Sequence, residues 1–519
     1  MRNKTFYTLL GLGQVAMVGA AAKPNLVVIH TDEQSFRTLS CYQQQLPEEE
    51  AFVWGKGVNS TTPNIDKLAK EGAICNRYYC ASPVSTPSRA SMFTGLYPQV
   101  TGAPKNGDRI RRDIPTLGSI LTNAGYSTSY VGKWHLEGDD GTQYYWVKEY
   151  NGGFTDNKYM MYGGHAPYFL LDKNGEPIEG KGVNEKAIVG KPEGSYIHLT
   201  DFFTDKTIEV IKRDQKKPFC VVVSIPDPHT PDYARPPYNT MYDKLNPQEP
   251  KTMKAEYADN RPAWGRGGEK DNNEAKNFDA AALKQYFGMV KHIDDCVGRI
   301  METLDKCGLT ENTIIVFTSD HGDMFFEHKR RNKGVPYEAS ARIPFVIRYP
   351  KAIPAGKVIN SAYVNTEFTP TMLGLMGVKT DAKFHGVDNS AEFVSKAKTV
   401  KGEHIVHFAK TGGWWVCATD GRYKLVLDKK ETPWLLDLEK DPMETQNFYN
   451  KPGYEKVSAD LQQVLLERLK ATECPSVTNT KQPLVLELLL SGNPKIYNTP
   501  PTLDSILLTN KIYPSLRVG

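Results

Sequence analysis

The sequence predicts an α/β fold: a doubly wound, mostly parallel sheet with a smaller C-terminal α+β subdomain that carries an antiparallel sheet. Three apolar runs rich in β-branched residues, 25–30, 219–225 and 313–318, are typical of strands covered on both faces. Between such runs apolar residues recur with a helical period, most clearly from 280 to 304. Strands that alternate with helices in this way are typical of doubly wound sheets.

The remaining elements follow in chain order. Residues 62–72 predict a capped helix, 117–125 predict a second helix with a glycine stop, and 127–131 predict a strand. Residues 139–200 are rich in Gly and Tyr without clear periodicity, so we expect an insertion or lid there. Short alternating runs predict the antiparallel sheet, at 405–408, 414–417, 423–427 and 434–438.

We expect three parts along the 519 residues: a signal peptide over 1–22, an α/β domain over 23–390 and an α+β subdomain over 391–519. The first part begins with Arg2 and Lys4, continues with an apolar stretch and ends in small residues, which is the order found in secretory leaders. No uninterrupted apolar run reaches the roughly 18 residues of a membrane span. The sequence therefore predicts export and cleavage, without stable membrane insertion.

The overall charge is close to neutral. The formal net charge is +4, and subtracting the two charges of Arg2 and Lys4 leaves +2, so no general affinity for nucleic acid is expected. With 39% apolar and 24% charged residues, the composition excludes a disordered or fibrous protein. The eight cysteines are scattered without a CxxC pair, so buried thiols and one or two disulfides both remain open.

A candidate nucleophile, Ser85, stands at the start of a short predicted helix. Pro87 suits the first helical turn, and Gly95 suits the position just after the last turn. The free N–H groups and positive dipole of such a helix start, together with Arg89 one turn later, would attract an anion beside Ser85. A plain surface turn rich in Ser, Thr and Pro would give the same short pattern.

Chemically capable side chains follow four of the predicted strands. They are Asp32 and Glu33, Lys133 and His135, His229, and Asp320 and His321. In doubly wound sheets ligands bind beyond the carboxyl ends of the strands, so we expect these side chains at one edge. The two acidic pairs favour a hard divalent ion, Ca²⁺ before Mg²⁺, with the imidazole of His321 as an additional ligand. Taken singly, each pair would also fit a solvated turn or a helix cap.

The segment Ser85-Thr86-Pro87-Ser88-Arg89, followed by Thr94-Gly95, resembles the signature of the formylglycine-dependent sulfatases of the alkaline phosphatase-like superfamily. In that family a Cys or Ser at the first position is oxidised to an aldehyde, so the resemblance implies a formylglycine at Ser85. Cys80 is a poorer match, because Val84 stands where the motif requires Arg. Further segments between residue 25 and about 447 resemble family motifs in the same order; they begin at Gly132, Asp227, Lys333, Ala341 and Asp437.

The resemblance implies a metal site. It assigns a divalent ion to four side chains and to the modified residue itself: Asp32, Glu33, Asp320, His321 and Ser85. Many family members have a second Asp where Glu33 stands, so this position departs from the family pattern.

The resemblance also implies how the sulfate ester is handled. A sulfate monoester carries one negative charge, and attack at sulfur builds charge on the leaving oxygen, so cations must meet both ends. Lys133 and Lys333 would bind the sulfate oxygens, and Arg89 with Lys133 would hold the hydrated aldehyde. His135 would take a proton during sulfate release, and His229 with Lys333 would assist departure of the alcohol.

We therefore expect an exported bacterial sulfatase, periplasmic or secreted, that acts on a sulfated carbohydrate and requires a formylglycine-generating maturation enzyme. Two alternatives stay open. One is a phosphoesterase or phosphonate hydrolase of the same superfold that uses Ser85 unmodified, and the other is a non-catalytic protein that binds sulfated glycans. The Tyr- and Gly-rich segment 162–165 and the basic segment 329–331 each fit either a sugar subsite or a solvated loop.

Overall fold

The computed structural model describes residues 23–138, 143–266, 274–410, 415–428 and 431–472, so the predicted signal peptide over 1–22 lies outside the described residues. A nine-stranded sheet forms the centre, in the order β12-β11-β2-β10-β9-β1-β8-β3-β4. Among the described strands every pairing in this sheet is parallel except the two made by β10. The strands are β1 (Asn25–Thr31), β2 (Ala73–Tyr79), β3 (Ser127–Lys133), β4 (Met160–Met161), β8 (Phe219–Ile225), β9 (Thr313–Ser319), β10 (Phe345–Arg348), β11 (Lys357–Val364) and β12 (Thr399–Val400).

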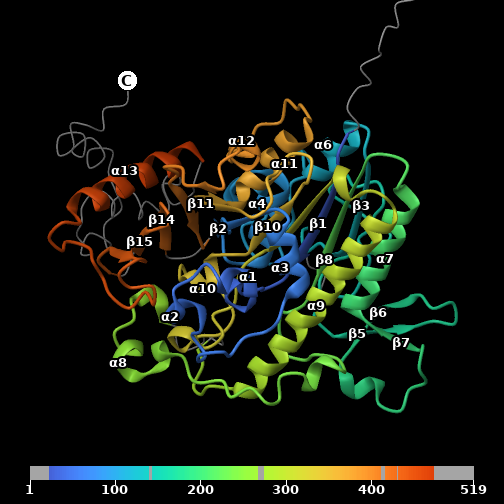
Figure 1. Cartoon of the computed structure of the whole chain (residues 1–519), viewed down its shortest axis with the longest axis horizontal. Coiled ribbons are helices and arrows are strands. Elements are labelled where there is room, and N and C mark those ends of the chain that lie inside the picture. Colours follow the sequence, from blue (N-terminus) through green and yellow to red (C-terminus); the bar gives the residue numbers. More distant parts are fainter. Residues whose placement is uncertain (1–22, 139–142, 267–273, 411–414, 429–430, 473–519) are drawn as a thin grey trace, which may run out of the picture.

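Helices cover both faces of this sheet (Figure 1). Alternate residues of β1 face opposite sides, Leu26 and Val28 toward one and Val27 and Ile29 toward the other, and all four are fully buried. The first side packs against α4 (Ser85–Thr94), α6 (Leu117–Asn123) and α11 (Phe368–Met376), and the second against α3 (Pro63–Lys70), α7 (Leu199–Asp214) and α9 (Ala280–Lys306). The predicted doubly wound sheet is confirmed, and the two-sided cover explains why its strands are apolar at consecutive positions.

The prediction omits five strands of this sheet: β2, β4, β10, β11 and β12. In β2 the partly buried Asn76 and Arg77 interrupt the apolar run, and β10 has only 4 residues. The predicted insertion over 139–200 contains a three-stranded sheet of order β6-β5-β7, formed by β5 (Tyr168–Leu171), β6 (Pro177–Val183) and β7 (Tyr196–His198). Because most of β6 is exposed, its sequence has no apolar alternation that would predict a strand.

The C-terminal part carries the predicted antiparallel sheet. Its strands pair in chain order: β13 (Val406–Ala409), β14 (Trp415–Thr419), β15 (Tyr423–Asp428) and β16 (Trp434–Asp437). On one face Leu425 packs in a cluster with Leu465 of α13 (Glu455–Ala471), and on the other Val426 packs with Tyr79 of β2. The predicted fold class is therefore confirmed, including the smaller subdomain beside the main sheet (Figure 1).

Short helices join the larger elements: α1 (Ser40–Gln43), α2 (Glu48–Ala51), α5 (Pro98–Thr101), α8 (Ala255–Ala258), α10 (Glu338–Ala341) and α12 (Ser390–Val394). All seven cysteines within the described residues are free thiols, and Cys474 lies outside them. Across the described part of the chain, no helix combines the length and the apolar character that a bilayer span requires.

Parallel pairing aligns the carboxyl ends of four strands. Thr31 pairs with Ile225 on one side and with Ser319 on the other, and Gly132 pairs with Ser224. The residues that follow these positions consequently emerge at one edge of the sheet, as the sequence predicts.

The edge leaves no room for a side chain at Gly132, whose φ is +100° and whose Cβ would lie 2.0 Å from the carbonyl oxygen of Ser224. We expect Gly132→Ala to lower the free energy of unfolding by about 3 kcal/mol, because overpacking costs roughly 1–3 kcal/mol and a left-handed backbone roughly 1–2 kcal/mol. Urea denaturation followed by circular dichroism measures the loss. Gly377→Ala is the matched control, because Gly377 has a φ of +66° and no atom within 4 Å of its Cβ. Equal losses in the two variants would contradict the steric argument.

Candidate active site

Ser85 is the first residue of α4, and its hydroxyl lies at the sheet edge. The side chain is 1% exposed, and Oγ lies 3.0 Å from Nε2 of His321, which follows β9. The other ring nitrogen of His321, Nδ1, is 3.0 Å from the carbonyl oxygen of Gly322, to which it donates. This hydrogen bond leaves the lone pair of Nε2 directed at Ser85, where it can accept a proton or bind a metal. The helix ends at Thr94, so Gly95 stands just after it as predicted, and Gly95 adopts the left-handed conformation.

Arg89 lies one helical turn after Ser85 and joins two strand ends. Its Nε donates to Asp320 Oδ2 at 2.9 Å and a terminal nitrogen lies 3.4 Å from Asp32 Oδ2. The other terminal nitrogen donates to the Lys133 carbonyl at 2.9 Å and to Ser224 Oγ at 2.7 Å. Arg89 therefore orders the two carboxylates, in addition to its predicted role beside the hydrated aldehyde.

Three predicted metal ligands lie together. Asp32, Asp320 and His321 are fully buried, and they can each direct one ligand atom into a group within 4.8 Å of one another. Burial opposes ionisation of Asp32, but the Lys133 ammonium, a hydrogen bond from His165 and Arg89 hold its pKa well below the usual value. Asp32 Oδ1 has no hydrogen-bond partner among the described residues. An ionised buried oxygen without a partner needs a cation or water, so this set fits a divalent ion.

Glu33 lies beside this cluster with a different set of neighbours. Its Oε2 is 3.1 Å from Lys333 Nζ and 3.0 Å from His229 Nε2, whereas Oε1 is buried without a partner among the described residues. Its backbone adopts a φ of +65°, and its carbonyl accepts a 2.6 Å hydrogen bond from Tyr286. The role of Glu33 as a metal ligand stays a prediction.

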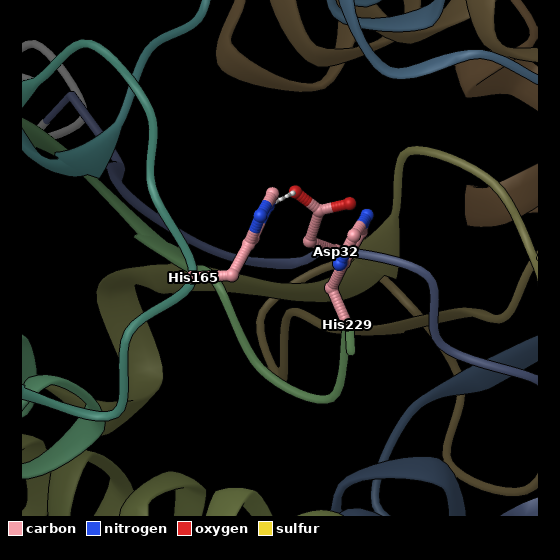
Figure 2. Close-up of side chains that lie close together, drawn as sticks. All are labelled: Asp32, His165 and His229. Atoms are coloured by element: carbon pink, nitrogen blue, oxygen red, sulfur yellow. Dashed lines mark ion pairs between the residues drawn. The ribbon is translucent and has the colours of Figure 1, made fainter. Parts of the chain in front are cut away.

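Two lysines and two histidines surround the carboxylates of Asp32 and Glu33. Lys133 Nζ contacts Asp32 Oδ2 and lies 2.7 Å from His165 Nε2, and Lys333 Nζ lies 2.8 Å from His229 Nε2. The His165 and His229 rings stack with centroids 3.7 Å apart and planes inclined by 4° (Figure 2). The edge thus presents two ammonium groups to any bound anion.

His135 is tied to the start of α4 through its backbone. Thr86 Oγ1 donates to the His135 carbonyl at 2.9 Å, and the ring packs edge-on against Tyr162 with centroids 5.2 Å apart. Nδ1 of the ring is buried without a hydrogen-bond partner among the described residues. Burial, followed by the charges of Lys133 and Arg89, lowers the pKa of His135 well below its usual value. The neutral ring can therefore accept a proton.

The structure does not favour Cys80 as the nucleophile, nor a solvated loop at the basic segment 329–331. Burial, followed by the charge of Asp320, raises the pKa of the Cys80 thiol well above its usual value, so Cys80 is a poor nucleophile. The basic segment 329–331 is not a solvated loop, because Arg330 is 3% exposed and Arg331 pairs with Asp232 while lying over the ring of Phe325.

Some residues of the site are absent from the prediction. His165 lies in the Tyr- and Gly-rich segment 162–165 and is not among the predicted site residues, because a single histidine in a non-periodic loop gives no pattern. Ser224 Oγ accepts a 2.7 Å hydrogen bond from Arg89, and Asn365 donates to Ser88 Oγ at 2.9 Å. Both are ordinary polar residues in sequence, and only their packing against α4 connects them to the site.

Two family models match this chain, and their matches overlap over residues 326–378. A family model described as sulfatase matches residues 24–378, and one described as N-sulphoglucosamine sulphohydrolase, C-terminal, matches residues 326–471. Two relatives are an N-acetylglucosamine-6-O-sulfatase of Bacteroides thetaiotaomicron, 25% identical over 91% of this chain and 92% of that protein, and an arylsulfatase of Clostridium perfringens, 28% identical over 87% and 95%. A third, an ulvan-active sulfatase of Formosa agariphila, is 28% identical over 86% of this chain and 81% of that protein.

Solved structures share the fold. A protein solved with its substrate D-glucosamine-2-N,6-O-disulfate superposes with a TM-score of 0.68 at 24% identity, covering 87% of this chain and 98% of that one. A phosphonate monoester hydrolase of Agrobacterium radiobacter superposes with a TM-score of 0.66 at 22% identity, covering 87% and 96%. At these identities the likeness concerns the fold alone.

If the cluster of Asp32, Asp320 and His321 binds calcium, the ion should stabilise the folded chain. At a concentration of 100 times the dissociation constant we expect a gain of about 2.7 kcal/mol, measured as a rise in the thermal midpoint. His321→Ala removes a ligand without leaving a buried charge unpaired, and should weaken calcium binding roughly tenfold or more in calorimetry. His407→Ala is the control, because His407 is also buried but packs on Tyr97. Unchanged affinity in His321→Ala would contradict the assignment.

Proposed function

The chain belongs to the sulfatase family and is a sulfuric ester hydrolase, and we propose that it releases sulfate from sulfated carbohydrates through a formylglycine made from Ser85. The observation that carries this proposal is the 3.0 Å contact between Ser85 Oγ and His321 Nε2, within a buried cluster of Asp32 and Asp320. It supports Ser85 as the modified residue, because this cluster fits a divalent ion, and a nucleophile for sulfate must stand where positive charge is gathered.

The substrate class is proposed from the relatives. Two that match more than four fifths of the chain are an N-acetylglucosamine-6-O-sulfatase and an ulvan-active sulfatase. Both names refer to carbohydrates, which favours a sulfated carbohydrate for this chain. The arylsulfatase relative makes aryl sulfates reasonable assay substrates.

Two groups that the chain must acquire complete the proposed chemistry. Asp32, Asp320 and His321, with Glu33 and residue 85 as further candidates, would hold a calcium or magnesium ion that supplies positive charge to the sulfate and to the attacking hydroxyl. The hydrated aldehyde would supply one hydroxyl for attack on sulfur and a second whose deprotonation re-forms the carbonyl and expels sulfate. Unmodified serine would instead remain as a sulfate ester without this route of release.

The chain's own residues have separate duties in the proposal. Lys133 and Lys333 bind the sulfate oxygens, and Arg89 keeps Asp32 and the hydrated residue in place. His135, neutral because burial and Lys133 lower its pKa, accepts the proton during sulfate release. His229, with Lys333 at 2.8 Å from Nε2, gives a proton to the departing alcohol oxygen. The net reaction converts the ester and water into the alcohol and hydrogen sulfate.

The proposal includes export with loss of residues 1–22, and a maturation enzyme that oxidises Ser85 beforehand. A phosphonate hydrolase shares the fold, so the fold alone does not separate sulfate from phosphonate substrates. Membership of the sulfatase family favours sulfate esters, and it favours turnover over simple glycan binding.

Mass spectrometry of the peptide containing Ser85 tests the modification. Conversion of serine to formylglycine should lower the peptide mass by about 2 units. Ser85→Ala should reduce kcat/KM for sulfate esters by about 10³-fold or more, because no nucleophile remains. Ser82→Ala is the matched control, since Ser82 is equally buried, lies three residues earlier and its Oγ has no hydrogen-bond partner among the described residues. Full activity in Ser85→Ala would contradict the proposal.

A substrate panel tests the reaction class. Defined sulfated monosaccharides and disaccharides should release sulfate, and phenyl phosphonate esters should be turned over with a lower kcat/KM. The physical reason is that Lys133, Lys333 and the metal together meet a singly charged sulfate ester with matching positive charge. A higher kcat/KM for the phosphonate esters than for every sulfate ester would favour the phosphonate hydrolase alternative.

A further inference from the structure

His165 is an unassigned side chain in the candidate active site. It follows β4 in the segment that leads to β5, and its ring lies flat against His229, with centroids 3.7 Å apart and planes inclined by 4° (Figure 2). The side chain is 24% exposed, so part of it borders the opening of the site. A stack this close and this parallel covers one whole face of the His229 ring.

Contacts on both sides fix the place of His165. Its Nε2 lies 2.7 Å from Lys133 Nζ and 3.6 Å from Asp32 Oδ2, the pair drawn as a dashed line in Figure 2. Its backbone N–H donates to the hydroxyl of Tyr144 at 2.9 Å. The Tyr144 ring also closes on Gly164, where a Cβ would lie 2.2 Å from a ring carbon. Contacts of both the backbone and the ring nitrogen therefore fix the position of the His165 side chain.

The His229 ring is held by polar contacts at both of its nitrogens and by the stack on His165. Its Nδ1 donates to the Thr230 carbonyl at 2.8 Å, which directs Nε2 toward Lys333 at 2.8 Å and Glu33 at 3.0 Å. A bound sulfate ester would compete for both of the latter contacts. The stack on His165 is a contact that a substrate at Nε2 leaves in place.

We propose that His165 is a positioning residue, which holds the plane of His229 so that Nε2–H meets the ester oxygen of the departing alcohol. This inference rests on the proposed sulfatase function and on the proton transfer by His229. His229 reacts as the imidazolium, with Nδ1–H on the Thr230 carbonyl and a second proton on Nε2 that is taken up from water before the step. The S–O bond then breaks, its electron pair stays on the alcohol oxygen, and the proton from Nε2 forms the new O–H bond. His229 is left neutral, with its ring still against His165.

The role of a positioned acid depends on the leaving group. An alcohol or phenol of high pKa needs a proton as the S–O bond breaks, whereas 4-nitrophenolate departs readily without one. Loss of the His165 ring should therefore slow esters of poor leaving groups and spare esters of good ones. A side chain that only binds sulfate or supports the metal would affect all leaving groups equally.

A series of aryl sulfates from 4-nitrophenyl to 4-methoxyphenyl sulfate tests this with the full-length, matured enzyme. In His165→Ala, kcat for 4-methoxyphenyl sulfate should fall about tenfold or more and kcat for 4-nitrophenyl sulfate less than about threefold, with KM little changed. His165→Phe keeps a flat ring against His229 and should restore kcat for the poor leaving group to within about threefold of the wild type. All members of the series are 4-substituted phenyl sulfates of similar shape, so differences in kcat between them do not come from contacts to a sugar.

The control is His404→Ala. His404 is 27% exposed and pairs with Glu392 at 2.9 Å, so it matches His165 in exposure and in having a carboxylate partner, and its removal should leave the leaving-group dependence unchanged. Equal losses across the series in His165→Ala, or no recovery in His165→Phe, would overturn the inference. If His165→Ala does not fold, His165→Gln replaces it, because Gln keeps a polar contact with Lys133 but has no ring. The inference then requires that kcat for 4-methoxyphenyl sulfate is higher in His165→Phe than in His165→Gln. A wild-type enzyme that hydrolyses no sulfate ester would instead overturn the proposed function, and this inference with it.

Discussion

The arrangement of the site depends on one buried guanidinium. Arg89 lies between Asp32 and Asp320, and all three side chains are fully buried. Two carboxylates side by side in the protein interior would not both stay ionised without a fixed positive charge, because burial and mutual repulsion favour their protonated forms. Since the two acids follow different strands, the pairing with Arg89 also holds those strand ends together.

A single helix delivers this cation and the candidate nucleophile. Ser85 and Arg89 are four residues apart in α4, so they lie on the same helical face, one turn from each other. When Arg89 reaches Asp320, Ser85 must face the neighbouring His321, to which it lies within 3.0 Å. The short motif therefore specifies a spatial relation between a hydroxyl and an acidic cluster.

The C-terminal sheet contributes to the site at a distance. The segment that carries Lys333 runs against this sheet, where Trp415 Nε1 donates to the Gly334 carbonyl at 3.3 Å and Lys424 Nζ to the Pro336 carbonyl at 2.9 Å. Lys424 is fully buried, so this anchor is rigid. The smaller subdomain thus supports the segment that carries Lys333, the cation that contacts Glu33 and His229.

The sequence by itself determined the elements whose signal is local. The apolar runs of β1, β8 and β9, the helix that starts at Ser85, and the polar residues at the strand ends follow from periodicity and spacing over a few residues, and together they predict the sheet and its functional edge. Only the tertiary structure decided that Glu33 faces Lys333 and His229, and that His165 stacks on His229. These contacts join segments that are distant in sequence, and the loop that bears His165 has no periodicity. Their geometry is set by packing between elements, which no local pattern of residues encodes.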